Sequence, residues 1–433
     1  MAPAHPDIEA LAAAVRADDA GGVARLLAGS PHLAAHLDEP MPGEGFGATP
    51  LLAAVHRNNR EMVDILLRAG ADVNARSHWW AGSFGVLDHD GPLSGFLIER
   101  GATVDVHAAS RLGMMDRLEA LLSADPALVR ARGGDGQTPL HFASSIEIAR
   151  YLLDRGADID ARDVDHESTP AQWMIRDRQA VARYLVKRGC QTDLLMSAAL
   201  GDEARLVACL DTDPAAIRTT VSDEYFPKQD PRSGGSIYNW TLGTGKTAHV
   251  IAHEFGHPGV VRTLMERSPD ELRLAVACEI GDEAAAQALL ASRPRLTESL
   301  TGADLRKLPD AARDQNREAV RLLLAAGWPV DARGQHGGTA LHWAGWHGDT
   351  AMAGELLRHD PPLEIADHDY GGTPLFWAVY GSVHGWRCRT GDYAGTVKVL
   401  LEAGARPPDL TPQLEASGPV REVLVRWRAS RAP

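Results

Sequence analysis

The chain has 433 residues, of which 44% are hydrophobic and 24% are charged, as is ordinary for a folded protein. Its formal net charge of −14 argues against a nucleic-acid binder, because such proteins carry a basic face. No apolar run is long enough to span a membrane, and the four cysteines form no C-x-x-C pair, so we expect a protein of a reducing compartment.

The N-terminal residues "MAPAHPDIEALAAAVRADD" lack the basic and apolar regions of a signal peptide, so we expect a cytoplasmic protein. After them, two features recur along the chain. One is G-x-T-[PA]-L, in which Thr caps a short helix and Pro takes its first position. The other is V-x-x-L-L followed by Gly-Ala-Asp, in which Gly adopts the left-handed conformation that ends a second helix. Together they predict one pair of helices per repeat.

The clearest copies, in chain order, are "GATPLLAAVHRNNREMVDILLRAGADVNAR" (47–76), "GQTPLHFASSIEIARYLLDRGADIDAR" (136–162), "GGTALHWAGWHGDTAMAGELLRHD" (337–360) and "GGTPLFWAVYGS" (371–382). Weaker copies fill the gaps at 10–31, 82–105, 106–126, 168–193, 195–214, 274–294 and 308–333. With the copy discussed next, they make about twelve repeats of roughly 33 residues.

One further stretch, "GTGKTAHVIAHEFGH" (243–257), contains the H-E-x-x-H pattern of zinc peptidases and a Gly-Lys-Thr triplet typical of phosphate loops. It fits the repeat pattern at every fixed position. The turn at Gly256 would separate His253 from His257, whereas zinc peptidases carry both histidines on one helix. A phosphate loop would need glycine where Trp240 stands. We therefore expect no metal and no cofactor.

These motifs resemble the ankyrin repeat over nearly the whole chain. The resemblance implies an all-α ankyrin-repeat solenoid of about twelve helix-turn-helix repeats, with short β-turn fingers and a concave groove. We expect a single array over residues 1–433, with an N-terminal capping repeat at 1–35 and a C-terminal cap at 408–433. Ankyrin arrays are often monomeric, and we expect a monomer here.

Two insertions lengthen the repeats, at 219–242 and at 383–395. Long loops in a compact array are functional or disordered, and aromatic residues at both ends of the first insertion indicate that it packs onto the array. A third irregularity, "RSHWWAGSFGVLDHDG" (76–91), replaces a first helix.

In ankyrin arrays, partners contact the finger tips and the two variable residues near the end of each first helix. The resemblance and the aromatic clustering give these candidate ligand- or partner-binding residues: His56, Arg57, Arg176, Asp177, Tyr238, Trp240, Glu254, Phe255, Arg313, Asp314, Trp346, His347, Tyr370, Tyr380 and Trp386. Aromatic residues are concentrated in the last two repeats, where rigid rings make good binding anchors.

Two functions stay open at this point. The first is a non-enzymatic scaffold that recognises an unidentified protein through its concave face and finger loops. The acidic balance would suit a partner with arginine-rich or amphipathic elements. The alternative is a small-molecule site in an aromatic-lined concave pocket closed by the 219–242 loop, with metal-free acid–base catalysis by Asp314, Glu254 or His347 if there is chemistry.

Overall fold

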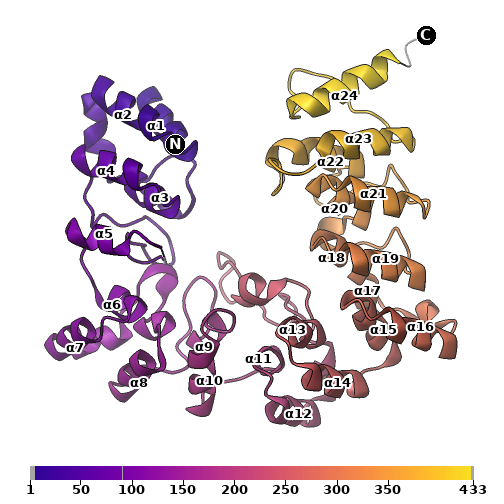
Figure 1. Ribbon diagram of the computed structural model, residues 1–433, viewed down its shortest axis with the longest axis horizontal. Coiled ribbons are helices and arrows are strands. Elements are labelled where there is room, and N and C mark those ends of the chain that lie inside the picture. The colour runs from indigo at the N-terminus through magenta and orange to yellow at the C-terminus, as the bar shows by residue number, and fades with distance from the viewer. Residues whose placement is uncertain (1–4, 90, 431–433) are drawn as a thin grey trace. The chain divides into compact units, whose positions relative to one another are not determined.

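The computed structural model describes residues 5–89 and 91–430, which form helices joined by turns and loops, with no strand among them (Figure 1). The chain divides into two compact units. Unit 1 comprises Met1–Thr212 and Thr219–Lys246, and unit 2 comprises Asp213–Arg218 and Thr247–Pro433. Within the described residues, no helix is both long and apolar enough to cross a bilayer.

In the described part of unit 1, the α-helices are α1 (Pro6–Arg16), α2 (Ala20–Gly29), α3 (Pro50–His56), α4 (Arg60–Arg68), α5 (Ser94–Glu99), α6 (Val106–Leu112), α7 (Met115–Ala124), α8 (Ile146–Asp154), α9 (Pro170–Trp173), α10 (Gln179–Lys187), α11 (Leu194–Leu200) and α12 (Glu203–Thr212). Short helical turns lie between them at η1 (Pro31–His36), η2 (Gly45–Gly47), η3 (Pro126–Arg130), η4 (Gly134–Gly136), η5 (Pro139–Phe142) and η7 (Asn239–Gly243).

Among the residues of unit 2 that the structure describes, the α-helices are α13 (Ala248–Glu254), α14 (Pro258–Arg267), α15 (Asp270–Glu279), α16 (Glu283–Ser292), α17 (Gly302–Leu305), α18 (Lys307–Arg313), α19 (Arg317–Ala326), α20 (Ala340–His347), α21 (Thr350–Leu357), α22 (Pro374–His384), α23 (Tyr393–Glu402) and α24 (Gly418–Ala429). Its short turns are η6 (Pro214–Arg218), η8 (Leu296–Ser299) and η9 (Gln335–Gly337).

Local chemistry explains where these helices begin and end. The Thr49 hydroxyl accepts a hydrogen bond from the backbone of Leu52 at 3.2 Å, and Pro50 takes the first position of α3. The Asn59 side chain caps α4 in the same way. After α4, Gly70 adopts a φ of 103°, which favours glycine. These are the start and stop signals that the repeat motif predicts.

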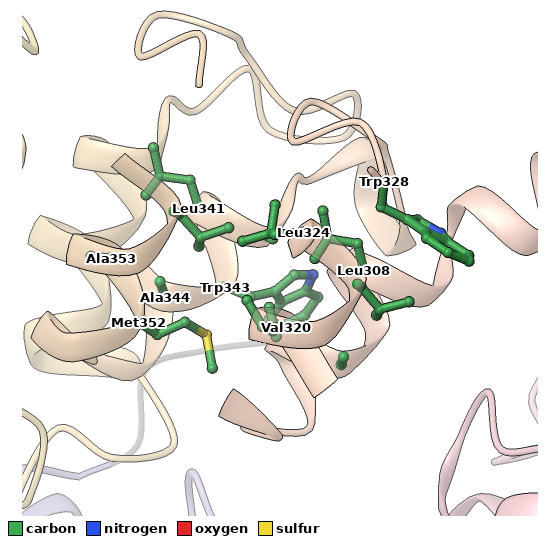
Figure 2. Close-up of a cluster of buried hydrophobic side chains, with 14 of the residues drawn as sticks. Leu308, Val320, Leu324, Trp328, Leu341, Trp343, Ala344, Met352 and Ala353 are labelled. Carbon is green, nitrogen blue, oxygen red and sulfur yellow. The ribbon is translucent and has the colours of Figure 1, made fainter. Parts of the chain in front are cut away.

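The core of each unit lies between successive helix pairs. Figure 2 shows this packing in unit 2, where the buried side chain of Trp343 on α20 lies among Leu308 of α18, Val320 of α19 and Met352 of α21. Burying such a side chain contributes about 1.5–3 kcal/mol, so the unit is stable only when neighbouring repeats cover one another.

The sequence around H-E-x-x-H divides between two elements. The first helix, α13, ends at Glu254, and His257 is the N-cap residue of α14. The repeat pattern predicts that the two histidines do not share one continuous helix, and the structure agrees.

Candidate functional site

The first insertion packs over the finger loop that precedes α9. The Ser233 hydroxyl and the Gly234 N–H both donate hydrogen bonds to the Asp165 carbonyl, at 2.6 and 2.9 Å. The His166 ring donates from Nδ1 to the carbonyl of Gly235 at 2.9 Å. The insertion is thus an ordered part of unit 1.

Two aromatic residues of the insertion have different environments. Tyr238 is fully buried, and its hydroxyl donates to the carboxylate of Asp193 at 2.9 Å. Its ring also packs edge-to-face on Phe226, with 5.3 Å between centroids. Trp240 is 72% exposed and lines a cavity. Tyr238 therefore anchors the insertion, and Trp240 is accessible to a ligand.

This cavity, called here the unit 1 cavity, has a volume of about 810 Å³. That size is within the range of small-molecule sites in proteins. Most of its wall is apolar, and the aromatic residues that line it are Phe46, Trp79, Phe84, Phe142, Trp173 and Trp240. They come from finger loops and first helices of neighbouring repeats, and from the insertion.

One wall of the cavity is polar and carries Asp135, Asp165 and His166. One ligand atom from each residue can be chosen so that all three lie within 4.8 Å of one another. The Trp79 indole donates to Asp135 Oδ1 at 3.0 Å. Burial raises the pKa of Asp135 to about 6, and the neighbouring carboxylates add to the rise while His166 opposes it.

Three arginines also line the cavity, and each has a hydrogen-bond acceptor away from these carboxylates. Arg111 donates to the carbonyl of Leu87 at 2.8 Å, and Arg178 donates to the carbonyl of His141 at 2.9 Å. Arg232 pairs with the carboxylate of Asp230 at 2.7 Å.

Most of the other unit 1 candidates lie outside the cavity. The rings of His56 and His89 are 4.0 Å apart, and burial lowers the pKa of His56 to about 4. Arg57 forms an ion pair with Glu44 at 2.9 Å. Arg176 and Asp177 are exposed, and Arg176 donates to the carbonyl of Thr241 in the insertion.

In unit 2, the structure brings three candidates together. Arg313 bonds to the carboxylate of Asp314 at 2.9 Å, and the His347 ring donates from Nε2 to the Arg313 carbonyl at 2.8 Å. His347 is buried, and burial lowers its pKa. Two other candidates lie at the end of α13, where Glu254 is exposed and Phe255 is half-buried.

Three aromatic candidates of unit 2, Trp346, Tyr380 and Trp386, form a continuous cluster. Trp386 packs against Trp346 and His347, with centroids 6.1 and 5.6 Å apart, and Trp346 stacks on Tyr380 at 6.5 Å. Trp346 is half-buried in this cluster, whereas Trp386 is 68% exposed.

Along α22, the rings of Phe376 and Tyr380 stack with 6.0 Å between centroids, and His384 stacks on Tyr380 at 4.3 Å. These residues are four apart, which places them on one helix face. Tyr370, in the preceding finger, is 71% exposed. The exposed residues Tyr370, Phe376, Tyr380 and Trp386 are called here the α22 aromatic surface.

Sequence reasoning missed the polar wall of the unit 1 cavity. Asp135 and Asp165 are thirty positions apart in finger turns that look ordinary one at a time. A usable signal was the finger "DVDHES" (163–168), in which an acidic residue and His166 stand next to each other.

Comparisons with known proteins agree with this architecture. The family "Ankyrin repeats (3 copies)" matches residues 106–196 and 308–410, and the family "Ankyrin repeat" matches residues 46–78.

Two curated proteins are similar to part of the chain. Alpha-latrocrustotoxin-Lt1a of Latrodectus tredecimguttatus is 27% identical over 144 residues, which are 33% of this chain and 8% of that protein. ANK repeat-containing protein nipk-1 of Caenorhabditis elegans is 32% identical over 128 residues, which are 26% of this chain and 18% of that protein. The chain therefore aligns with less than a fifth of either relative.

Among solved structures, the ankyrin repeat domain of Bcl-3, a member of the IkappaB protein family, aligns with 55% of this chain and 98% of its own. The identity is 20% and the TM-score is 0.31. The family matches together cover more than half of the chain. Because the family matches and the observed helix pairs agree, the chain belongs to the ankyrin repeat family.

Proposed function

We propose that this protein is a non-enzymatic scaffold that binds a protein partner through the α22 aromatic surface. Ankyrin repeats are protein-interaction scaffolds in general, and the first helices and fingers of a stack supply their binding face. The observation that carries the proposal is the exposure of four large aromatic side chains on α22 and its flanking loops. Exposed aromatic groups of this kind are typical of binding sites, because rigid rings bury a large area at low entropic cost.

Two carboxylates flank this surface and indicate the chemistry of the partner. Asp369 pairs with His336 at 2.7 Å, and the His336 ring lies 5.6 Å from that of Tyr370. Glu415 pairs with His384, which stacks on Tyr380. Aromatic faces beside carboxylates suit guanidinium groups, which can stack on a ring and pair with an acid. We propose a partner segment that carries arginine among apolar residues.

A peptide-display selection tests this proposal. Random linear peptides are selected on the wild-type protein and, in parallel, on a variant carrying Tyr370→Ser, Phe376→Ser, Tyr380→Ser and Trp386→Ser. The expected result is a set of arginine-containing peptides that bind the wild type and lose at least tenfold in affinity on the variant, which corresponds to about 1.4 kcal/mol.

The control variant carries Met114→Ser and Val425→Ser, which remove exposed apolar side chains that are not part of the α22 aromatic surface. It should bind the selected peptides as the wild type does. Circular dichroism and thermal unfolding establish that each variant is folded. Peptides that bind the fourfold variant equally well, or a selection that enriches nothing above background, would contradict the proposal.

A further inference from the structure

We propose that Asp135, Asp165 and His166 bind a divalent first-row transition-metal ion at the wall of the unit 1 cavity. The proposal concerns unit 1 and does not depend on the partner-binding surface of unit 2. It also departs from the sequence analysis, which names no metal ligand.

The imidazole of His166 is held in the state that a metal requires. Its Nδ1 lies 2.9 Å from the carbonyl oxygen of Gly235, and a carbonyl can only accept a hydrogen bond. The ring proton of the neutral form is therefore on Nδ1, and Nε2 carries the lone pair. Nε2 lies 3.6 Å from Asp165 Oδ2. Metal-binding histidines are usually oriented by such a second hydrogen bond.

The two carboxylates are buried and oriented by other donors. Asp165 is 4% exposed, and its Oδ1 accepts a hydrogen bond from the Gly234 N–H at 3.2 Å. Asp135 is 7% exposed, and its Oδ1 accepts from the Trp79 indole at 3.0 Å. Among the described residues, Asp135 Oδ2 has no hydrogen-bond donor. This oxygen is not enclosed, because Asp135 lines the cavity, so it is available to a cation that enters there.

Unit 2 provides an internal comparison, because its fingers repeat the same geometry. His336 occupies the finger position of Asp135, and Asp369 occupies that of Asp165. In unit 1 the backbone carbonyl of Asp135 accepts a hydrogen bond from the backbone of the next finger at 2.7 Å. In unit 2 the backbone carbonyl of His336 does the same at 2.8 Å. The side chains of His336 and Asp369 then form an ion pair at 2.7 Å.

Unit 1 places two acids where unit 2 places a histidine and an acid. In unit 2 the pair is solvent-accessible, whereas in unit 1 Asp135 and Asp165 are buried, and the insertion packs on Asp165. Like charges at buried neighbouring sites repel strongly, and a bound cation would offset that repulsion. Arg232, which also lines the cavity, pairs with Asp230.

The donor set selects the class of ion. One imidazole nitrogen with two carboxylate oxygens suits Zn²⁺, Co²⁺ or Mn²⁺, whereas Mg²⁺ and Ca²⁺ prefer oxygen alone. All three ligands line the cavity, so the remaining coordination positions would face a space large enough for water or a small ligand.

Metal binding is tested with Zn²⁺, Co²⁺ and Mn²⁺ themselves, on tag-free protein freed of metal with a chelator. A second group, His5, Asp7 and His32, also has metal-ligand spacing and is largely exposed, so every measurement uses a background with His5→Ala and His32→Ala. Equilibrium dialysis with elemental analysis gives the stoichiometry, titration calorimetry gives the affinity, and Co²⁺ absorption reports nitrogen and oxygen ligation. We expect one equivalent of at least one of these ions, bound more tightly than Mg²⁺ or Ca²⁺.

Asp135→Asn and His166→Asn should each weaken binding by at least about tenfold. Trp79→Phe removes only the indole donor and should weaken binding less than loss of a ligand. The matched control, His336→Asn with Asp369→Asn in unit 2, should leave the affinity unchanged.

A further readout does not depend on metal. Because Asp135→Asn removes one of two buried like charges, its metal-free form should unfold at a higher temperature than the metal-free parent. Asp135→His copies the unit 2 pair and should behave in the same way, which provides a second variant if the first does not fold. The absence of stoichiometric binding, or binding that Asp135→Asn and His166→Asn leave intact, would overturn the proposal.

Discussion

The hydroxyl of Tyr238, whose side chain is fully buried, donates a hydrogen bond to the carboxylate of Asp193 across 2.9 Å. Asp193 also caps α11 by accepting from the backbone of Met196 at 2.8 Å. Burial raises the pKa of the Asp193 carboxyl, and these hydrogen bonds oppose the rise. One carboxylate therefore ties the insertion to the first helix of a repeat.

Tyr238→Phe should destabilise unit 1 by about 1–3 kcal/mol, because Asp193 Oδ2 then keeps only the longer hydrogen bond from Gln172, at 3.4 Å. The free energy of unfolding from urea titration measures the effect. Tyr151→Phe is the matched control, because the Tyr151 hydroxyl is buried without a hydrogen-bond partner among the described residues, and its removal should cost nothing. A cost below about 0.5 kcal/mol for Tyr238→Phe would show that the bond does not hold the insertion.

The stability of unit 2 should fall as pH falls below about 6.5. Burial lowers the pKa of His342 from 6.5 to about 4, so the unfolded chain binds this proton more tightly than the folded chain. The stabilising contribution is complete above pH 6.5 and is lost as pH falls toward 4. At pH 5 the loss from this residue is about 2 kcal/mol.

Urea titrations between pH 7.5 and pH 5 measure that dependence, and His342→Gln should reduce it. Glutamine fits this position, because Gln172 in unit 1 already accepts from the backbone of Thr169 at 2.9 Å, as His342 accepts from Thr339 at 3.0 Å. An unchanged pH dependence in the folded variant would contradict the assignment.

Lys307→Met should destabilise unit 2 by about 3–5 kcal/mol at pH 8. Lys307 pairs with Glu279 at 3.0 Å and both side chains are buried, so the change leaves a buried charge without its partner. The double variant Lys307→Met with Glu279→Gln should recover part of the loss. A double variant no more stable than the single one would exclude this explanation.

The Lys307–Glu279 pair predicts a pH effect opposite in sign to that of His342. Burial raises the pKa of Glu279, and a raised pKa in the folded state means that folding is favoured as pH falls. Without Lys307 the pKa of Glu279 in the folded state should be raised further, because Lys307 opposes the effect of burial. The destabilisation by Lys307→Met, measured against the wild type at each pH, should therefore be smaller at pH 5.5 than at pH 8.

Gly234→Ala should destabilise metal-free unit 1 by about 1–3 kcal/mol through overpacking. A Cβ at this position would lie 3.0 Å from His166 Cε1 and 3.3 Å from Asp165 Oδ2. Gly95→Ala in α5 is the control of opposite sign, because a Cβ there meets no atom within 4 Å and alanine favours a helix by about 0.5–1 kcal/mol. Equal stability of the two variants in urea titration would argue against close packing of the insertion on its finger.

The candidate binding residues were predictable from the sequence only in part. The repeat register placed Tyr370 and Tyr380 on the expected binding face, and the structure exposes both. Their role in binding stays a prediction. The same register also selected Arg313 and His347, which the structure buries. Register identifies the face of a helix, but exposure depends on what neighbouring repeats and loops place above that face.

The amino-acid sequence by itself determined the helix pairs and the ankyrin repeat, and the comparisons confirm both. The reason is that each signal is local: Thr49 and Pro50 start a helix, and Gly70 ends the next, through contacts a few residues away. The insertion has no such period, so only the tertiary structure showed that Tyr238 is buried while Trp240, two residues later, lines a cavity. Stacking of successive fingers brings Asp135 beside Asp165, and the insertion packs on Asp165; neither relation is contained in a local pattern.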